Sequence, residues 1–320
     1  EGGYPVLVYA HALGGVFNEA MSGEGLAVEL ARSSAHAAVL AIELPQHGAR
    51  RGASERAAED LLVNLLNPAA IRGNVLQGAA DLWGAIALAQ AGIPAELAPG
   101  AAAIRFDASR LALFGQGQGG AHAAIALAAD DDVRSVVLAN VAGHFATQLQ
   151  RVKPAPFGAL LPLLLADFDE DLRLPGSLTN PMLAHMQAVL DAADPINYAA
   201  RLYRDSIPSG RDVFLVYGRE DHYSPDPALE AYAKAARMQA VAPDLSMHFD
   251  DLPAPVQHNV SVGDERRTVA LRQYDPSDDP VSPGEVRDGH FVVQSSKAAR
   301  ADVVRFLTQA LSGQAPSIGL

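Results

Sequence analysis

The chain has 320 residues, of which 49% are hydrophobic and 19% charged, with a formal net charge of −13 and no cysteine. These values are typical of a globular protein with one large core or a core plus a smaller inserted domain, and they exclude a disordered chain and any thiolate site. The acidic balance also argues against a nucleic-acid or anionic-membrane partner, because phosphate groups are bound by clustered Lys and Arg.

Short apolar runs alternate with longer helical patterns along the chain. Strands are predicted, in chain order, at 5–10, 37–42, 110–114, 135–139 and 212–217. Helices are predicted at 23–33, 70–91, 119–129, 227–240 and 296–311. This alternation predicts an α/β fold with a mostly parallel sheet covered by helices on both faces. Since the chain enters a buried strand almost at once, we expect upstream residues, with one or two edge strands, in the native protein.

Residues 144–205 interrupt the alternation with short apolar helical pieces separated by prolines. We therefore predict a core domain at 1–143 and 206–320 and a helical cap at 144–205. The apolar run at 157–165 suits a lid over a hydrophobic substrate, but extra helical packing on the core explains it equally well. No run reaches the ~18–20 apolar residues of a membrane span. A second interruption, at 252–274, predicts a hairpin near Gly263.

The sequence LALFGQGQGG at 111–120 runs from a predicted strand directly into an Ala-rich helix. This is the setting of the nucleophile elbow G-x-S-x-G, with Gly117 at the position of the serine. Gly115 and Gly119 are the small neighbours that allow the strand and the helix to approach each other. A hydroxyl at 117 would face the cleft, and the oxyanion formed by its attack would meet the backbone N–H of Gln118.

The same glycines also match a dinucleotide fingerprint, because Gly115, Gly117 and Gly120 have the spacing G-x-G-x-x-G. That motif belongs near a first strand and needs an acidic residue ~20 positions later. Here the motif lies in mid-chain, and the acids at 130–132 come too early. A dinucleotide-dependent oxidoreductase is therefore the less favoured hypothesis, and we expect no cofactor.

An acid and a histidine follow the elbow in the order that a hydrolase requires. Asp221 lies just after the strand at 212–217, and His290 lies in a late loop before the last helix. The order nucleophile, acid, histidine is the one that α/β-hydrolases use. Asp221 could instead cap the following helix, with Glu220 or Asp205 as the orienting acid, and His290 could be a structural histidine.

Two early loops complete the pattern. The sequence HALGG at 11–15 is similar to the H-G-x-G-G loop, with Ala12 in place of a glycine, and His47-Gly48 is similar to a second common loop. Together these features resemble the α/β-hydrolase superfamily over nearly the whole chain, and three shorter motifs resemble bacterial extracellular lipases and esterases. Those motifs are RGNVLQGAAD at 72–81, DPINY at 194–198 and DGH at 288–290.

The resemblance implies hydrolysis of a small hydrophobic carboxylic ester without a cofactor, in a secreted or periplasmic protein. It implies a catalytic triad of position 117, Asp221 and His290, with Leu13 and Gln118 supplying the oxyanion-hole N–H groups. Glycine offers no nucleophile, and loss of one triad member costs on the order of 10⁴–10⁶-fold in rate.

Three explanations of Gly117 remain: a serine replaced in a competent esterase, a natural pseudoenzyme that binds a ligand, or a water-based hydrolase. Because Asp221 and His290 are retained, we favour the first. The remaining histidines show no metal-binding spacing, so we expect structural roles and no metal site; they are histidines 36, 122, 144, 185, 222, 248 and 258. We interpret Arg72 and Asp81, on the long helix at 70–91, as an ion pair that supports packing.

Overall fold

A computed structural model describes residues 2–23, 25–100, 102–153, 180–203, 210–245, 251–252, 254–276 and 287–319. Its centre is an eight-stranded sheet in the order β2-β1-β3-β4-β5-β10-β6-β7, in which neighbouring strands pair parallel. The strands of this sheet are β1 (Tyr4–Ala10), β2 (Ala38–Ile42), β3 (Phe106–Gln116), β4 (Ser135–Ala139), β5 (Asp212–Gly218), β6 (Gln239–Val241), β7 (Asp251–Leu252) and β10 (Val269–Tyr274). The predicted parallel α/β architecture is confirmed.

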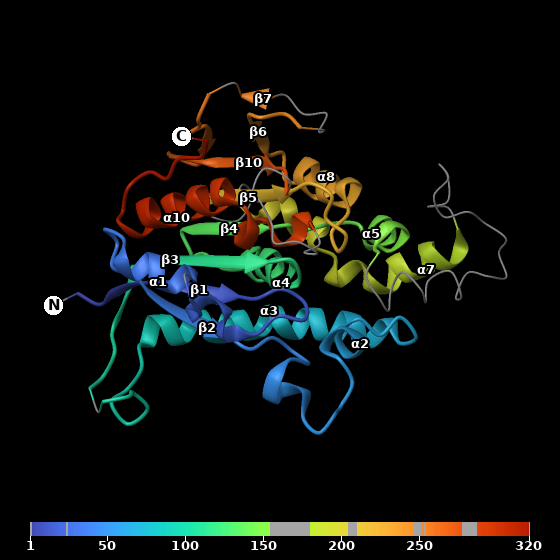
Figure 1. The fold of residues 1–320 in the computed structure, drawn as a ribbon, viewed down its shortest axis with the longest axis horizontal. Helices are drawn as coiled ribbons and strands as arrows, with labels where there is room; N and C mark the ends of the chain where they lie inside the picture. The colour runs from blue at the N-terminus through green and yellow to red at the C-terminus, as the bar shows by residue number, and fades with distance from the viewer. Residues whose placement is uncertain are drawn as a thin grey trace.

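Helices cover both faces of this sheet (Figure 1). Helices α3, α4 and α8 pack against one face, and α1, α9 and α10 pack against the other. Their bounds are α1 (Leu26–Arg32), α3 (Pro68–Ala91), α4 (Gln118–Leu127), α8 (Asp226–Ala235), α9 (Val292–Ser295) and α10 (Lys297–Leu311). Among the described residues, no helix combines the length and apolarity needed to cross a bilayer.

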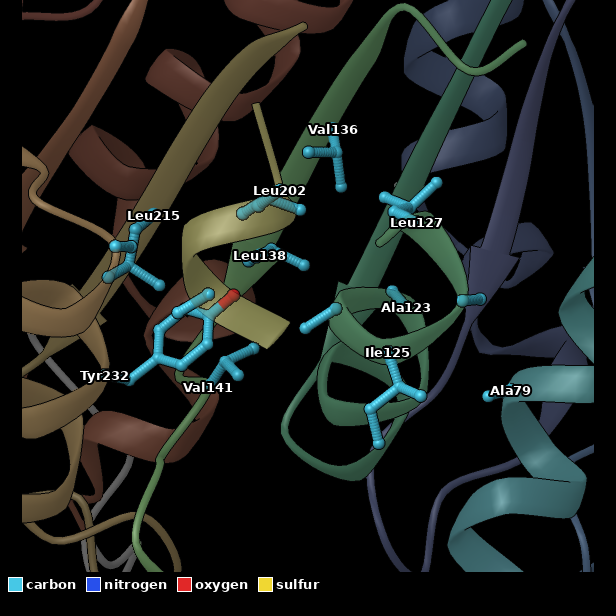
Figure 2. Close-up of a cluster of buried hydrophobic side chains, with 14 of the residues drawn as sticks. Ala79, Ala123, Ile125, Leu127, Val136, Leu138, Val141, Leu202, Leu215 and Tyr232 are labelled. Atoms are coloured by element: carbon cyan, nitrogen blue, oxygen red, sulfur yellow. The ribbon is translucent and has the colours of Figure 1, made fainter. Parts of the chain in front are cut away.

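The core follows from the alternation of side chains along buried strands. Every residue of β4 is buried, and Val136 and Leu138 face α4 while Val137 and Ala139 face the opposite layer. Figure 2 shows Val136 and Leu138 on the side of β4 that faces the Ala-rich helix α4, where Ala123 and Leu127 are labelled. Because alanine side chains are short, α4 can lie close to the sheet. Its first turn begins directly after the end of β3 and is held there by this packing.

The predicted elements match the structure closely except toward the far edge of the sheet, where strands β6, β7 and β10 were not predicted. All five predicted strands form, and so does the predicted hairpin, as β8 (Val260–Val262) and β9 (Glu265–Arg267) around Gly263. The helix predicted at 227–240 is wrong in its last part, because α8 ends at Ala235. Arg237 has a positive φ of 50°, which breaks the helix, and the chain then enters β6.

Residues from the predicted cap lie beyond the carboxyl ends of the central strands, where Figure 1 shows α5 (Phe145–Arg151) and α7 (Pro181–Leu190). Asp194 ties this region together, because its carboxylate accepts from the backbone N–H groups of His144, Phe145 and Ile196. The following 3₁₀ helix η6 (Pro195–Arg201) packs on α4 and α8 of the core. The apolar run at 157–165 lies outside the described residues, and a separate cap at 144–205 stays a prediction.

A fully buried arginine joins the end of α4 to the start of β5. The guanidinium of Arg211 donates to four backbone carbonyls, those of Leu127, Asp130, Val133 and Leu202. The Asp130 carboxylate lies 3.7 Å away. Burial lowers the pKa of Arg211 to about 10, so the guanidinium is charged at neutral pH. Its donors therefore satisfy carbonyls that water does not reach.

Replacing Arg211 with Met should lower the free energy of unfolding by about 3–5 kcal/mol, because it leaves buried carbonyls without donors. Guanidinium denaturation of the variant and the parent chain measures this loss. The matched control is Arg151→Met on the exposed end of α5, which should change stability by less than about 0.5 kcal/mol. Equal stabilities of the two variants would show that the hydrogen bonds of Arg211 do not stabilise the fold.

Candidate active site

The elbow at the head of α4 has the geometry that the sequence predicts. Gly117 joins β3 to α4 with φ 50° and ψ −113°, a conformation that side chains rarely adopt. Its N–H donates to the carbonyl of Ala139, and its carbonyl accepts from Ala121. A Cβ at Gly115 would lie 2.7 Å from the carbonyl oxygen of Gly119, so only glycine fits there. The backbone at 117 thus turns sharply at the edge of the sheet.

Asp221 and His290 form a buried pair next to this elbow. Nδ1 of His290 donates to Asp221 Oδ2 at 2.9 Å, and Oδ1 lies 3.1 Å away. The Asp221 carboxylate also accepts from the backbone N–H groups of Tyr223 and Ser224. Of the alternative orienting acids, Glu220 adjoins the pair with a positive φ, but Asp221 and not Glu220 bonds to the imidazole, and Asp205 lies outside the described residues.

The imidazole of His290 faces Gly117 directly. A Cβ atom at position 117 would lie 2.5 Å from Cε1 and 2.6 Å from Nε2 of His290. Nε2 is buried and has no hydrogen-bond partner within the described part of the chain. Because Nδ1 carries the proton shared with Asp221, Nε2 presents its lone pair to the bare backbone at 117. The pair can therefore act as a base toward a molecule bound there.

Two backbone N–H groups flank the same point. The amides of Leu13 and Gln118 donate to no protein acceptor among the described residues. Both residues line a cavity of about 70 Å³ that also contains Gly117 and His290. Free N–H groups at the start of a helix and in a glycine-rich turn favour negative charge, as an oxyanion hole requires.

Charge and burial act in opposite directions on the His290 imidazole. Burial acts to lower the pKa of His290, but the Asp221 carboxylate and its hydrogen bond, with Asp288 further away, outweigh burial and raise it above 6.5. Burial raises the pKa of the Asp221 carboxyl, and the imidazole opposes this shift. The carboxylate therefore stabilises an imidazolium that forms when His290 accepts a proton.

Space for a substrate lies on both sides of this centre. The cavity of about 70 Å³ has mostly apolar walls; its residues include Val63, Ala142, Phe145, Leu149, Val152 and Pro195. A second cavity of about 580 Å³ adjoins it, because Leu13 and Tyr223 line both. This second cavity contains more polar groups, including Glu19, Glu59 and Gln116. A molecule held at Gly117 could thus place one end in an apolar space and the other in a polar one.

Comparison with known proteins identifies the fold. Neither a protein-family model nor a curated protein matches the chain. Among solved structures, acylaminoacyl peptidase from Pyrococcus horikoshii is 12% identical with a TM-score of 0.51, covering 100% of this chain and 38% of that one. A puromycin-hydrolyzing peptidase of Mycobacterium tuberculosis is 16% identical with a TM-score of 0.51, covering 97% and 35%. The chain has the α/β-hydrolase fold.

Acetyl xylan esterase 1 from Thermoanaerobacterium sp. JW/SL YS485 is also similar, at 15% identity and a TM-score of 0.46, covering 88% of this chain and 72% of the esterase. The chain spans less than two fifths of the length of the two peptidases. At these identities the likeness concerns the fold, and the chemistry of the site has to be argued from its own residues.

Several residues that hold this site together carry no recognisable motif. Asn140, in a left-handed conformation after β4, accepts from the N–H of Gly218 and donates to the carbonyl of Gly289. It thereby ties the loop that carries Asp221 to the loop that carries His290. Gln116 donates to the backbone carbonyl of His290, and the ring of Tyr223 packs on the imidazole at 4.6 Å. An asparagine directly after a buried strand was the available signal for Asn140.

The predicted ion pair between Arg72 and Asp81 does not form. A helix rises 1.5 Å per residue, so nine positions place them about 13 Å apart on α3. Asp81 pairs instead with Arg50 at 2.6 Å, and Arg72 donates to the carbonyl of Val189 in α7. Within the described residues, no three His, Asp or Glu side chains are grouped to hold a metal ion.

His122 lies beneath the elbow and is fully buried on α4. The side-chain amide of Gln118 donates to its Nε2 at 2.7 Å, and its Nδ1 has no partner within the described chain. Burial, with the nearby His47 and His11, lowers the pKa of His122 to about 3. The folded protein therefore holds this ring neutral, whereas the unfolded chain protonates it below about pH 6.5.

This difference predicts a specific pH dependence of stability. Above pH 6.5 the His122 ring is neutral in both states and contributes no dependence; as pH falls from 6.5 toward 3, the unfolded state alone binds the proton. The free energy of unfolding should then fall by about 1.4 kcal/mol per pH unit more steeply in the parent chain than in His122→Gln. Denaturant titrations between about pH 5 and pH 7 measure both slopes. Parallel slopes would mean that His122 is protonated in the fold.

Proposed function

We propose that this chain is built as a carboxylic-ester hydrolase that lacks its nucleophilic hydroxyl, and that it turns esters over slowly or not at all. The observation that carries this proposal is the buried Asp221–His290 pair, whose free Nε2 faces Gly117 where the fold places a nucleophile. The free amides of Leu13 and Gln118 next to it support the same reaction class.

In this chain a water molecule bound beside Gly117 would have to take the place of the serine. His290 Nε2 accepts a proton from the water while the water oxygen attacks the ester carbonyl. The carbonyl oxygen becomes an oxyanion that accepts from the amides of Leu13 and Gln118, and Asp221 stabilises the imidazolium. The imidazolium then returns the proton to the departing alcohol oxygen, which releases the acid and the alcohol.

The size of the apolar cavity supports a short acyl group. Its volume of about 70 Å³ leaves little room between the walls formed by Phe145, Leu149 and Val152. The larger and more polar cavity beyond Leu13 and Tyr223 leaves space for the alcohol portion. An uncharged ester with a small acyl group fits both spaces better than a polyanion, given the net charge of −13.

One observation favours a second candidate function, a pseudoenzyme that binds an ester without cleaving it. The His290 ring already occupies the space that a side chain at 117 would enter, at 2.5–2.6 Å from a Cβ there. A site adapted to glycine over a long period would close in this way. Such a protein keeps the cleft and its amides as a binding surface, and restoring a hydroxyl would gain nothing.

The two candidates are separated by Gly117→Ser, with Gly117→Ala as the matched control that adds the same Cβ without a hydroxyl. On p-nitrophenyl esters, the serine variant should gain on the order of 10⁴-fold in kcat/KM over the parent chain, and the alanine variant should gain nothing. Acetyl and butyryl esters should be cleaved faster than long-chain esters, because the apolar cavity is small.

Adding His290→Ala to the serine variant should return the rate to that of the parent chain, since nucleophile and base act as a unit. A folded Gly117→Ser variant that is no faster than Gly117→Ala would contradict the hydrolase proposal. It would leave a binding protein with a hydrolase fold.

A further inference from the structure

The amide of Leu13 lies in a short turn at residues 11–15 that belongs to no helix or strand. A single backbone bond closes this turn, from Gly15 N–H to the carbonyl of Ala12 at 3.0 Å. Gly14 within it has a φ of 75° and is exposed. Such a turn can change its backbone geometry at little cost, so the position of the Leu13 N–H depends on what holds the turn from outside.

The imidazole of His47 makes that outside contact. Its Nε2 accepts from the Gly14 N–H at 3.0 Å, and its Nδ1 donates to the carbonyl of Pro45 at 2.8 Å. The ring is 1% exposed, so its two nitrogens depend on these protein partners. Only the neutral ring with its proton on Nδ1 can make both bonds.

A second buried histidine supports the same turn from its other end. Nδ1 of His11 donates to the carbonyl of Ala12 at 2.8 Å, and Nε2 accepts from the N–H of Leu44 at 3.2 Å. The rings of His11 and His47 meet edge to face, with centroids 4.8 Å apart. The turn is thus fastened at Ala12 and at Gly14, the two residues on either side of Leu13.

We infer that His47 is a positioning residue for the Leu13 amide. In its neutral form the His47 ring holds the turn at residues 11–15 in place through its bond to Gly14, and on protonation it releases the turn. We call this bond the lock. A proton on Nε2 would remove the acceptor of the Gly14 N–H and set two N–H donors against each other, so this bond would break. The role of the turn in turnover rests on the proposed function, whereas the lock itself does not.

The surroundings of His47 determine the pH at which the lock opens. Four titratable groups face it from the neighbouring elements: His11 after β1, Glu43 after β2, Glu59 on α2 (Ala58–Leu62) and His122 on α4. Burial is the largest influence and lowers the pKa of His47; His11 adds to this, and the bond to Pro45 with the two glutamates opposes it. The lock is therefore closed at neutral pH and opens only below pH 6.5.

The lock can be tested in the parent chain without measuring turnover. NMR of ¹⁵N-labelled protein follows the His47 ring nitrogens and the Gly14 amide as pH is lowered, with the His47→Gln spectrum assigning the ring signals. We expect the Gly14 amide to shift with the same midpoint as His47, below 6.5. A Gly14 amide that stays unchanged while His47 titrates, or a midpoint at or above 6.5, would overturn the inference.

The kinetic test uses the Gly117→Ser background and compares His47→Leu with His47→Gln, whose side-chain oxygen can accept from Gly14 but does not titrate. His47→Leu should lower kcat about 10- to 100-fold with little change in KM, because a misplaced amide weakens only the transition state. His185→Leu, an exposed change on α7, serves as the matched control.

The pH profiles distinguish positioning from a general loss of structure. With His47 present, protonation of His290 and of His47 both lower the rate, so log kcat/KM should fall with a slope approaching two over about one or two pH units below the His47 midpoint; with His47→Gln the slope should be one throughout. Equal slopes would contradict the lock. If Gly117→Ser proves inactive while the Gly14 and His47 signals titrate together, the proposed function fails and the lock stands.

Discussion

The buried hydrogen bond from His290 Nδ1 to Asp221 is the interaction on which the rest of the site depends. It fixes the tautomer of the imidazole, and it therefore decides that Nε2 presents a lone pair to Gly117. The bond is possible only because two chain segments 69 residues apart meet without side chains between them. Gly218 and Gly289 are in such close contact that neither could carry a Cβ, and Asn140 bonds to both.

The parallel sheet explains why these segments meet. Strands β3, β4 and β5 lie side by side, so the residues that follow their carboxyl ends converge at one edge: Gly117, Asn140 and Asp221. The helices on both faces hold this edge rigid, and the Ala-rich helix α4 places the elbow against it. The backbone of residue 117, with its positive φ, defines the elbow, and no side chain is needed for it.

Glycine at 117 also relieves a conflict that a serine would create. The backbone there has a positive φ, and a Cβ would press on the His290 ring. A side chain at this position would therefore be strained, as active-site residues often are, and glycine avoids that strain. The turn at 11–15 is held by His11 and His47. The position of the Leu13 amide, the proposed oxyanion donor, therefore depends on the His47 ring, which must stay neutral.

Much of the fold could be predicted from local pattern, because the central strands are short apolar runs bounded by glycines and helices. The elbow and its partners at 221 and 290 could be predicted for the same reason: each follows a recognisable strand or precedes a helix. Strand β10 was hidden within a polar, irregular stretch, and its place between β5 and β6 follows from long-range pairing. Asn140, Gln116 and His47 act through backbone groups distant in sequence, and no local pattern reports such contacts.

Covalent labelling of Gly117→Ser with an alkyl fluorophosphonate, followed by intact-mass and peptide analysis, tests most directly whether the site lacks only its nucleophile. The reagent reacts only with a hydroxyl that a neighbouring base activates and an oxyanion hole supports. We expect one adduct per chain, mapped to position 117, absent from the parent chain and lost when His290→Ala is added. A folded variant that takes up no label at 117 would contradict the claim that only the nucleophile is missing.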